Sequence, residues 1–298
     1  MFDVAPDKLR PCALQQHRHF AAALRACGRE PLMLEGPERL LVMQRRFRLG
    51  LRVALVSQAA LPTPQKLIHR AQEAGLHRHL ILLSPDQPMP QLAGIGAVPV
   101  MTPATVVGID LTPTRDARRA TLHQKWRNRL VHGEQQRLRI TRQNMPLKPG
   151  HWLMLAEAAQ QRRLRYRTWP EALTLAYGRE TPGASKLFTA FEGHDPVAAM
   201  LFLRHGARAT YHISHITTRG RALSAHNLLL WQAADWLACK GHQRLDLGLI
   251  NTQSTPGLAR FKLGAGARAH VLGGTWALWP PLGRTLQSLA RLDRMGRV

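Results

Sequence analysis

Two charged residues near the end of the sequence stand where they could assist the transfer of an acyl group. Asp246 lies in the short apolar run RLDLGLIN, and Lys262 follows Phe261 in GLARFKLGAGAR. Attack of an amine on an acyl carbonyl passes through a tetrahedral oxyanion, which a fixed cation stabilises. Lys262 is therefore the candidate oxyanion donor, although it could equally hold a substrate phosphate or be a solvated lysine at a helix end.

Asp246 is the candidate partner of this lysine. A carboxylate at a strand end can accept a proton from the attacking amine or orient that amine. The same carboxylate could instead cap the turn that follows the strand.

The neighbours of this pair are candidates for lining a substrate cleft. Phe261 is expected to pack inward and fix Lys262, while Gly264 and Gly266 would let a substrate approach the backbone closely. Asn251 and Thr252 follow the predicted strand end directly and are assigned to the same cleft.

A second candidate site, for phosphate, precedes a long apolar run. In TTRGRALSAHN, the residues Arg219, Gly220, Arg221 and Ser224 combine two cations, a glycine and a helix-capping residue. Backbone N–H groups at a helix N-terminus bind phosphate, so this stretch is predicted to hold a substrate phosphate. A basic loop capped by Ser224 is the alternative.

A basic segment lies in the middle of the chain. Leu122, Trp126 and Leu130 recur every four residues, which predicts a helix over residues 115–133 with an apolar stripe. Trp126 in this stripe is expected to pack in the core, with base stacking as the alternative. Its basic residues are candidates for binding an anionic acceptor or an RNA backbone, or form a solvated face: Lys125, Arg127 and Arg129.

Composition narrows the class of protein. The 298 residues include 42 Lys and Arg against 18 Asp and Glu, a net charge of +24. Such a charge favours polyanionic partners, although an arginine-rich composition alone would also produce it. Three scattered cysteines, no apolar leader and no long apolar stretch predict a cytoplasmic protein. Fifteen histidines occur without a metal-ligand motif, so no metal site is expected.

Strand-like and helix-like runs alternate twice along the chain, which predicts two halves built on one plan. Residues 151–178 and the run RALSAHNLLLWQAADWLACKG are expected to be helical, and ARAHVLGGTWALW is expected to be one final strand. The predicted segments are a helical lead-in at 1–30, a first half at 31–113, a helical connection at 114–180, a second half at 181–281 carrying the site, and a basic C-terminal helix at 282–298.

Three stretches together resemble a known family. HQKWRNRLVHGEQQ, GHQRLDLGLIN and GLARFKLGAGAR are similar, in order and spacing, to elements of the Fem-type aminoacyltransferases and of bacterial GNAT-domain relatives within the GNAT acyltransferases. The resemblance covers roughly residues 35–280. This chain lacks the long charged helical hairpin of some Fem enzymes, which puts tRNA binding in doubt.

The resemblance implies an α+β fold with tandem GNAT-like halves. Each half would be a mixed, largely antiparallel sheet flanked by helices, and a basic helical connection would join them. It also implies transfer of an aminoacyl or acyl group, from aminoacyl-tRNA or a coenzyme A thioester, to an amine such as one on a cell-envelope precursor. No tightly bound cofactor is expected. The alternative is a degenerate GNAT scaffold that binds RNA or an anionic membrane surface without catalysis, with the C-terminal helix as one membrane contact.

Overall fold

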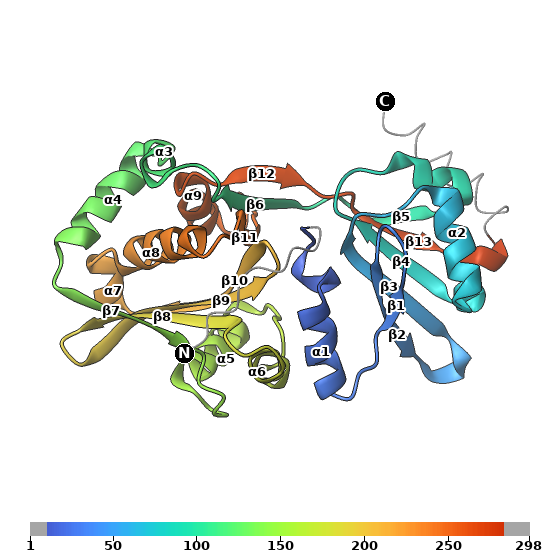
Figure 1. Ribbon diagram of the computed structural model, residues 1–298, viewed down its shortest axis with the longest axis horizontal. Coiled ribbons are helices and arrows are strands. Elements are labelled where there is room, and N and C mark those ends of the chain that lie inside the picture. The colour runs from blue at the N-terminus through green and yellow to red at the C-terminus, as the bar shows by residue number, and fades with distance from the viewer. Residues whose placement is uncertain (1–10, 283–298) are drawn as a thin grey trace. The chain divides into compact units, whose positions relative to one another are not determined.

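The computed structural model describes residues 11–282, which form two compact units. One unit contains residues 11–14 and 106–269, and the other contains residues 15–105 and 270–282. Each unit is built around a mixed sheet, as expected (Figure 1). The first ten residues of the predicted lead-in, and residues 283–298 of the predicted C-terminal helix, lie outside the described residues.

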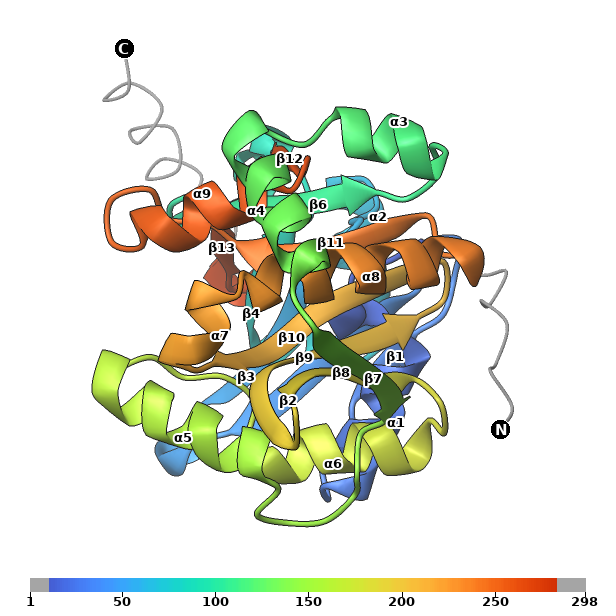
Figure 2. The ribbon, with the colours of Figure 1, turned by 90° about the vertical axis from the view of Figure 1, so that its left-hand side faces the viewer.

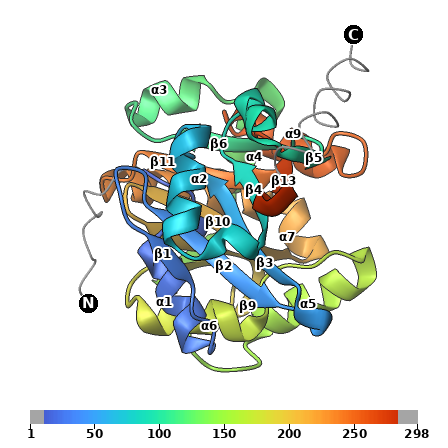
Figure 3. The ribbon, with the colours of Figure 1, turned by 90° about the vertical axis from the view of Figure 1, so that its right-hand side faces the viewer.

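The six-stranded sheet has the order β1-β2-β3-β4-β13-β5. β1 to β3 pair antiparallel, and β3 pairs parallel with β4 after a crossover through α2. α2 lies on one face of this sheet and α1 on the other (Figure 3). The bounds are α1 (Arg18–Ala26), β1 (Leu32–Leu34), β2 (Leu40–Arg46), β3 (Arg52–Ala59), α2 (Pro64–Glu73), β4 (Leu80–Pro85), β5 (Val98–Met101) and β13 (Thr275–Leu278).

The seven-stranded sheet has the order β12-β6-β11-β10-β9-β8-β7. β7 to β10 form an antiparallel meander, and β10 pairs parallel with β11 after α7 and α8. The strands are β6 (Thr105–Asp110), β7 (Leu138–Asn144), β8 (Ser185–Glu192), β9 (Asp195–His205), β10 (Arg208–Ile216), β11 (Arg244–Leu249) and β12 (Arg268–Val271). The helices are α3 (Arg115–Ala120), α4 (Gln124–Gln135), α5 (Trp152–Leu164), α6 (Glu171–Glu180), α7 (Thr218–Ala222), α8 (Ala225–Cys239) and α9 (Pro256–Gly264).

Both sheets thus repeat one plan, an antiparallel meander followed by a parallel pair, which confirms the predicted duplication. The seven-stranded sheet uses β6 to β12, which are consecutive in the sequence, whereas the six-stranded sheet takes its strand β13 from beyond them. β6, which follows the strands of the first sheet, pairs with β11, and β13, near the C-terminus, pairs with β4 and β5. The prediction of one final strand was therefore wrong, because Leu272–Gly274 separate β12 and β13, which belong to different sheets.

Three predicted helical segments are interrupted. The segment 115–133 forms α3 and α4, because the His123 side chain caps a new helix at the Lys125 amide. The segment 151–178 breaks after α5, where Arg165 has a φ of 53° and Pro170 precedes α6. Ser224, also with a φ of 53°, separates α7 from α8. The predicted helical connection 114–180 moreover contains β7, which pairs along its whole length with β8.

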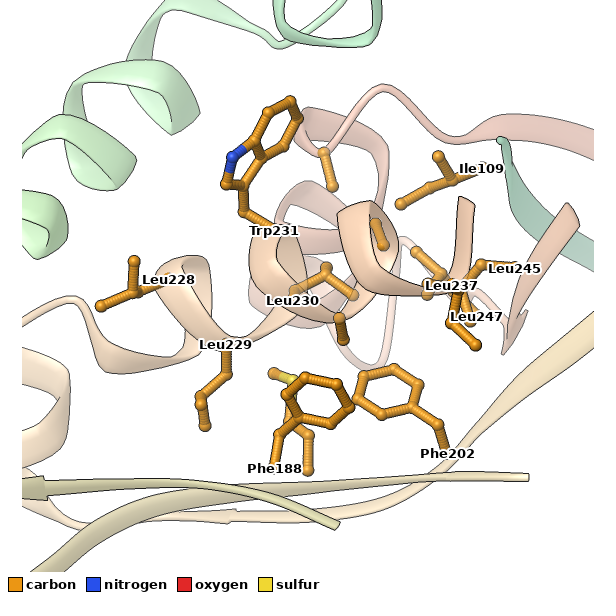
Figure 4. Close-up of a cluster of buried hydrophobic side chains, with 14 of the residues drawn as sticks. Ile109, Phe188, Phe202, Leu228, Leu229, Leu230, Trp231, Leu237, Leu245 and Leu247 are labelled. Atoms are coloured by element: carbon orange, nitrogen blue, oxygen red, sulfur yellow. The ribbon is translucent and has the colours of Figure 1, made fainter. Parts of the chain in front are cut away.

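α8 forms the centre of the larger core. It was predicted to be apolar on nearly every side, and nine of its fifteen residues are buried. Phe188 and Phe202 rise from the sheet toward one side of α8, whereas Trp231 points away from the sheet (Figure 4). α5 and α6 cover the other face of the sheet (Figure 2). Within residues 11–282, no helix has both the length and the apolar character needed to cross a membrane.

α7 is held against β9 through a glycine. The Thr217 amide and hydroxyl both donate to the Val197 carbonyl, and a β-carbon at Gly220 would collide with that same carbonyl oxygen. Gly220 is therefore required where α7 approaches the sheet.

We expect Gly220→Ala to lower the free energy of unfolding by about 1–3 kcal/mol, because backbone must move to admit the methyl group. Gly257→Ala is the matched control, since a β-carbon there meets nothing within 4 Å. The control should be neutral or more stable by up to about 1 kcal/mol. Urea unfolding followed by tryptophan fluorescence measures both, and equal effects would contradict this account of Gly220.

Candidate functional site

The site forms where two parallel strands stop pairing. β10 and β11 pair only through Arg208–Thr210 and Arg244–Asp246, although both strands continue along their other neighbours to Ile216 and Leu249. Each strand has an irregular register at this point, between Tyr211 and Ile213 in β10 and between Asp246 and Gly248 in β11. The last residues of both strands therefore present backbone groups that the partner strand does not use.

Lys262 reaches the end of β11 from α9. Its side chain is buried, with 6% of the residue exposed, and Nζ donates a hydrogen bond of 2.8 Å to the Leu249 carbonyl. Burial lowers the pKa of Lys262 to about 8. Nζ also lies 4.0 Å from where a β-carbon of Gly248 would be, which is an ordinary van der Waals distance. An ammonium group has three donors, and the Leu249 carbonyl takes one of them.

His226, in the first turn of α8, reaches the end of β10. Its Nε2 lies 3.0 Å from the His215 carbonyl. Burial, partly opposed by this hydrogen bond, lowers the pKa of His226 to about 4. The imidazole is therefore neutral near pH 7, and its contact with a carbonyl requires the tautomer that carries the proton on Nε2.

Phe261 connects these groups. Its ring centroid lies 6.2 Å from that of His226 and 6.1 Å from that of Trp126. Trp126 is buried in the core, as predicted. Phe261 is half-buried, so a chain of rings from α4 to α8 fixes the helix turn that carries Lys262.

Asp246 is engaged by a neighbour on its own strand. Arg244 Nε lies 2.5 Å from the Asp246 carboxylate, and both side chains are partly buried. The turn after β11 is capped by Asn251 instead, whose side chain accepts from the Gln253 and Ser254 amides. The alternative that Asp246 caps this turn was therefore wrong. Asn251 has a structural task, and Thr252 is exposed in the same turn.

Gly264 and Gly266 each lie against another part of the protein. A β-carbon at Gly264 would lie 3.0 Å from the Trp126 ring, and one at Gly266 would lie 2.5 Å from the Thr121 hydroxyl. Gly266 also has a φ of +79°. The close backbone approach inferred from these glycines is thus made by α3 and α4, which corrects the expectation that a substrate makes it.

The predicted phosphate loop is largely occupied by internal contacts. Arg219 forms a two-point ion pair with Glu192, with Nε 2.8 Å from one carboxylate oxygen, and the Gly220 amide donates to the Thr217 hydroxyl. The Ser224 hydroxyl lies 3.2 Å from His132 Nδ1. Arg221 is exposed, and its charge contributes to lowering the pKa of both His215 and His226. The structure therefore brings Arg221 close to the site.

The basic residues of α4 divide into two kinds. Arg127 donates to the carbonyls of Ala120 and Leu122 and so closes the end of α3. Lys125 and Arg129 are exposed. Their proposed role toward an anionic partner stays a prediction.

Sequence reasoning missed His226. It lies within the quoted stretch TTRGRALSAHN, but nothing in its type or spacing distinguishes it from the other fourteen histidines. The available signal was topological. A strand, a buried helix and a second strand predict a parallel pair, and side chains in the first turn of such a helix lie near the end of the first strand.

The assembled site is therefore a buried cation and a neutral imidazole, each bound to a carbonyl at the end of one of two strands that have separated. Such an arrangement can stabilise negative charge that develops on a carbonyl oxygen placed beside Lys262. It contains hydrogen-bond donors fixed in position.

Comparison with known proteins supports the predicted family resemblance. A sequence model of the family described as acetyltransferase (GNAT) domain matches residues 114–263, about half of the chain. No curated protein sequence matches.

Solved structures with the same fold cover nearly all of the chain. The crystal structure of FemX has a TM-score of 0.74 at 12% identity and covers 93% of this chain and 95% of its own. The C-terminal domain of a putative lysylphosphatidylglycerol synthetase from Agrobacterium fabrum has a TM-score of 0.56 at 13% identity, with coverages of 95% and 93%. The structure of L-PGS from Bacillus licheniformis has a TM-score of 0.55 at 12% identity and covers 95% of this chain and 98% of its own. These similarities confirm the predicted fold resemblance.

Burial of Lys262 makes the stability of the protein depend on pH. Because its pKa is about 8 in the folded protein against an ordinary value of 10.5, the unfolded chain binds more protons at this residue between these pH values. Stability therefore rises with pH across this window. We expect the free energy of unfolding of the native protein, relative to Lys262→Met, to rise by on the order of 2 kcal/mol from pH 7 to pH 10. Urea unfolding at several pH values measures the difference, and a constant difference would contradict the burial of a titrating amine.

Proposed function

The chain belongs to the acetyltransferase (GNAT) domain family, and from this premise we propose that it transfers an aminoacyl group from an ester donor to an amine. The observation that carries the proposal is the contact of Lys262 with Leu249, at the point where β11 leaves β10. A donor carbonyl placed between the separated strands would meet the remaining N–H donors of this ammonium group.

The reaction needs no covalent enzyme intermediate. The acceptor nitrogen forms a bond to the acyl carbon, and the carbonyl oxygen takes the negative charge, which Lys262 stabilises. Collapse of the intermediate breaks the bond to the donor oxygen, and the proton lost by the amine accounts for the proton gained by the leaving hydroxyl. With a pKa of about 8, Lys262 is mostly protonated near pH 7 and supplies the positive charge that this step requires.

Two observations favour a tRNA ester over a coenzyme A thioester as the donor. The loop that would hold a pyrophosphate already binds Glu192 through Arg219 and Thr217 through the Gly220 amide. The net charge of +24 favours a long polyanion. One of the similar structures is also named as a putative lysylphosphatidylglycerol synthetase, which supports an aminoacyl group as the one transferred.

Arg221 is the proposed donor-phosphate contact of this site. It is exposed beside His215 and His226, next to the N-terminus of α8, where the helix dipole favours negative charge. Ser224, the residue before α8, does not cap the helix with its side chain.

We expect Lys262→Met to lower the rate of aminoacyl transfer by about 10²–10³-fold, the loss typical of one oxyanion donor. The assay follows radiolabelled amide formed from a charged total tRNA pool and a mixture of small amines. Lys148→Met, at an exposed lysine, is the matched control and should retain full activity. Retained activity in Lys262→Met would remove this residue from the mechanism.

We expect isothermal titration with total tRNA to show saturable binding that weakens steeply as salt rises, because phosphate contacts release counterions. Arg221→Ala should weaken this binding, whereas Arg78→Ala, an exposed arginine of the other unit, should not. Saturable binding of coenzyme A instead would assign a thioester donor. Tight tRNA binding with no transfer to any amine would favour the non-catalytic binding scaffold.

A further inference from the structure

A pocket apart from Lys262 lies within the unit of residues 106–269. It is open to solvent and is lined by residues from β6, α3, α4, α8, the end of α9 and β12. Neither Lys262 nor His226 lines it. It lies on the side of α8 that Trp231 faces, away from Phe188 and Phe202 (Figure 4).

The walls of this pocket are mainly aromatic and aliphatic. Trp126 and Trp231 are joined by Ile109, Leu230 and Ala234. Each of these five residues is less than 10% exposed. Arg115 and Arg119 already lie over the Trp231 ring, each with its guanidinium carbon 5.6 Å from the ring centroid. The ring surface that remains favours a ligand with a small, flat, apolar body, which gains dispersion contacts there.

Three buried N–H groups in the pocket residues have no hydrogen-bond acceptor in the described part of the chain. They are Nε1 of Trp126, Nε1 of Trp231 and Nε of Arg118. Each residue is only 5–6% exposed. Other buried donors also lack acceptors, but these three belong to residues that line the same pocket. An unpaired buried donor is unfavourable, so a ligand that supplies acceptors, after small side-chain shifts, would be stabilised here.

The charges around the pocket also favour a ligand with acceptors. Arg118 uses its two terminal nitrogens on Asp235 and on carbonyls of the chain, so only Nε remains. Arg268 is exposed at the rim. Asp110 already accepts two hydrogen bonds from Thr112. The site thus has donors and a cation to offer, although the charge of this same Arg268 also acts on the Asp110 carboxylate and contributes to lowering its pKa.

We propose that this pocket binds a small aromatic carboxylate. The ring lies against Trp126 and Trp231, and the carboxylate accepts hydrogen bonds from Arg268 and from the unpaired N–H groups. The pocket lining contains none of Lys262, His226 and Arg221, although its Trp126 also packs against Phe261, the residue before Lys262.

The test uses the full chain, ¹⁵N-labelled and titrated with benzoate or phenylacetate. The sequence has seven tryptophans, and Trp126→Phe and Trp231→Phe assign the two indole N–H signals of interest. We expect these two signals to shift downfield saturably, with the other five unmoved. Trp276 is an internal control, because its Nε1 already donates to the Gly273 carbonyl at 2.9 Å.

Variants at exposed arginines give a second test, which does not depend on whether the tryptophan variants fold. Arg268→Gln should weaken benzoate binding at least fivefold, whereas Arg260→Gln, at an exposed arginine of α9, should leave it unchanged. Benzamide, which has the same ring without the charge, should bind more weakly than benzoate. Absence of saturable shifts for either acid, or equal binding of benzamide, would overturn the proposal.

Discussion

The separation of β10 from β11 is the constraint on which the candidate site depends. Backbone carbonyls at a strand end need donors when the neighbouring strand no longer provides them. Here two side chains provide them, His226 for His215 and Lys262 for Leu249. The same contacts that complete the sheet also fix the position of a cation. The contacts that satisfy the strand ends are therefore the same contacts that position the groups of the proposed reaction.

The packing of α8 and α9 holds these two side chains in position. α8 must be buried to place His226, and its apolar residues fill the core between the sheet and α4. α9 must be rigid to place Lys262, and Phe261 packs against Trp126 for that purpose. Gly264 allows α9 to approach the same tryptophan. An apparently local feature, one lysine after one phenylalanine, thus rests on elements more than a hundred residues away.

Local patterns predicted the elements well. The alternation of strand-like and helix-like runs predicted two halves built on one plan, and the four-residue spacing of Leu122, Trp126 and Leu130 predicted a buried helix face. The breaks at His123 and Ser224 were not visible, because each depends on a single capping or left-handed residue. Lys262 and Phe261 could be singled out from their surroundings. The partners of Arg219, Asp246 and Gly266 could not, since contacts between distant segments determine them.

The place of β13 in the six-stranded sheet has a consequence for dividing this protein into fragments. β13 joins β4 to β5, so a fragment ending at residue 105 would lack the strand that connects two others of its sheet. A fragment beginning at residue 111 would lose β6, which lies between β11 and β12. No single cut in the polypeptide yields two complete sheets. Independent domains would have to be made by rearranging the gene, with the segment encoding β13 moved behind β5 and the segment encoding β6 retained with the second half.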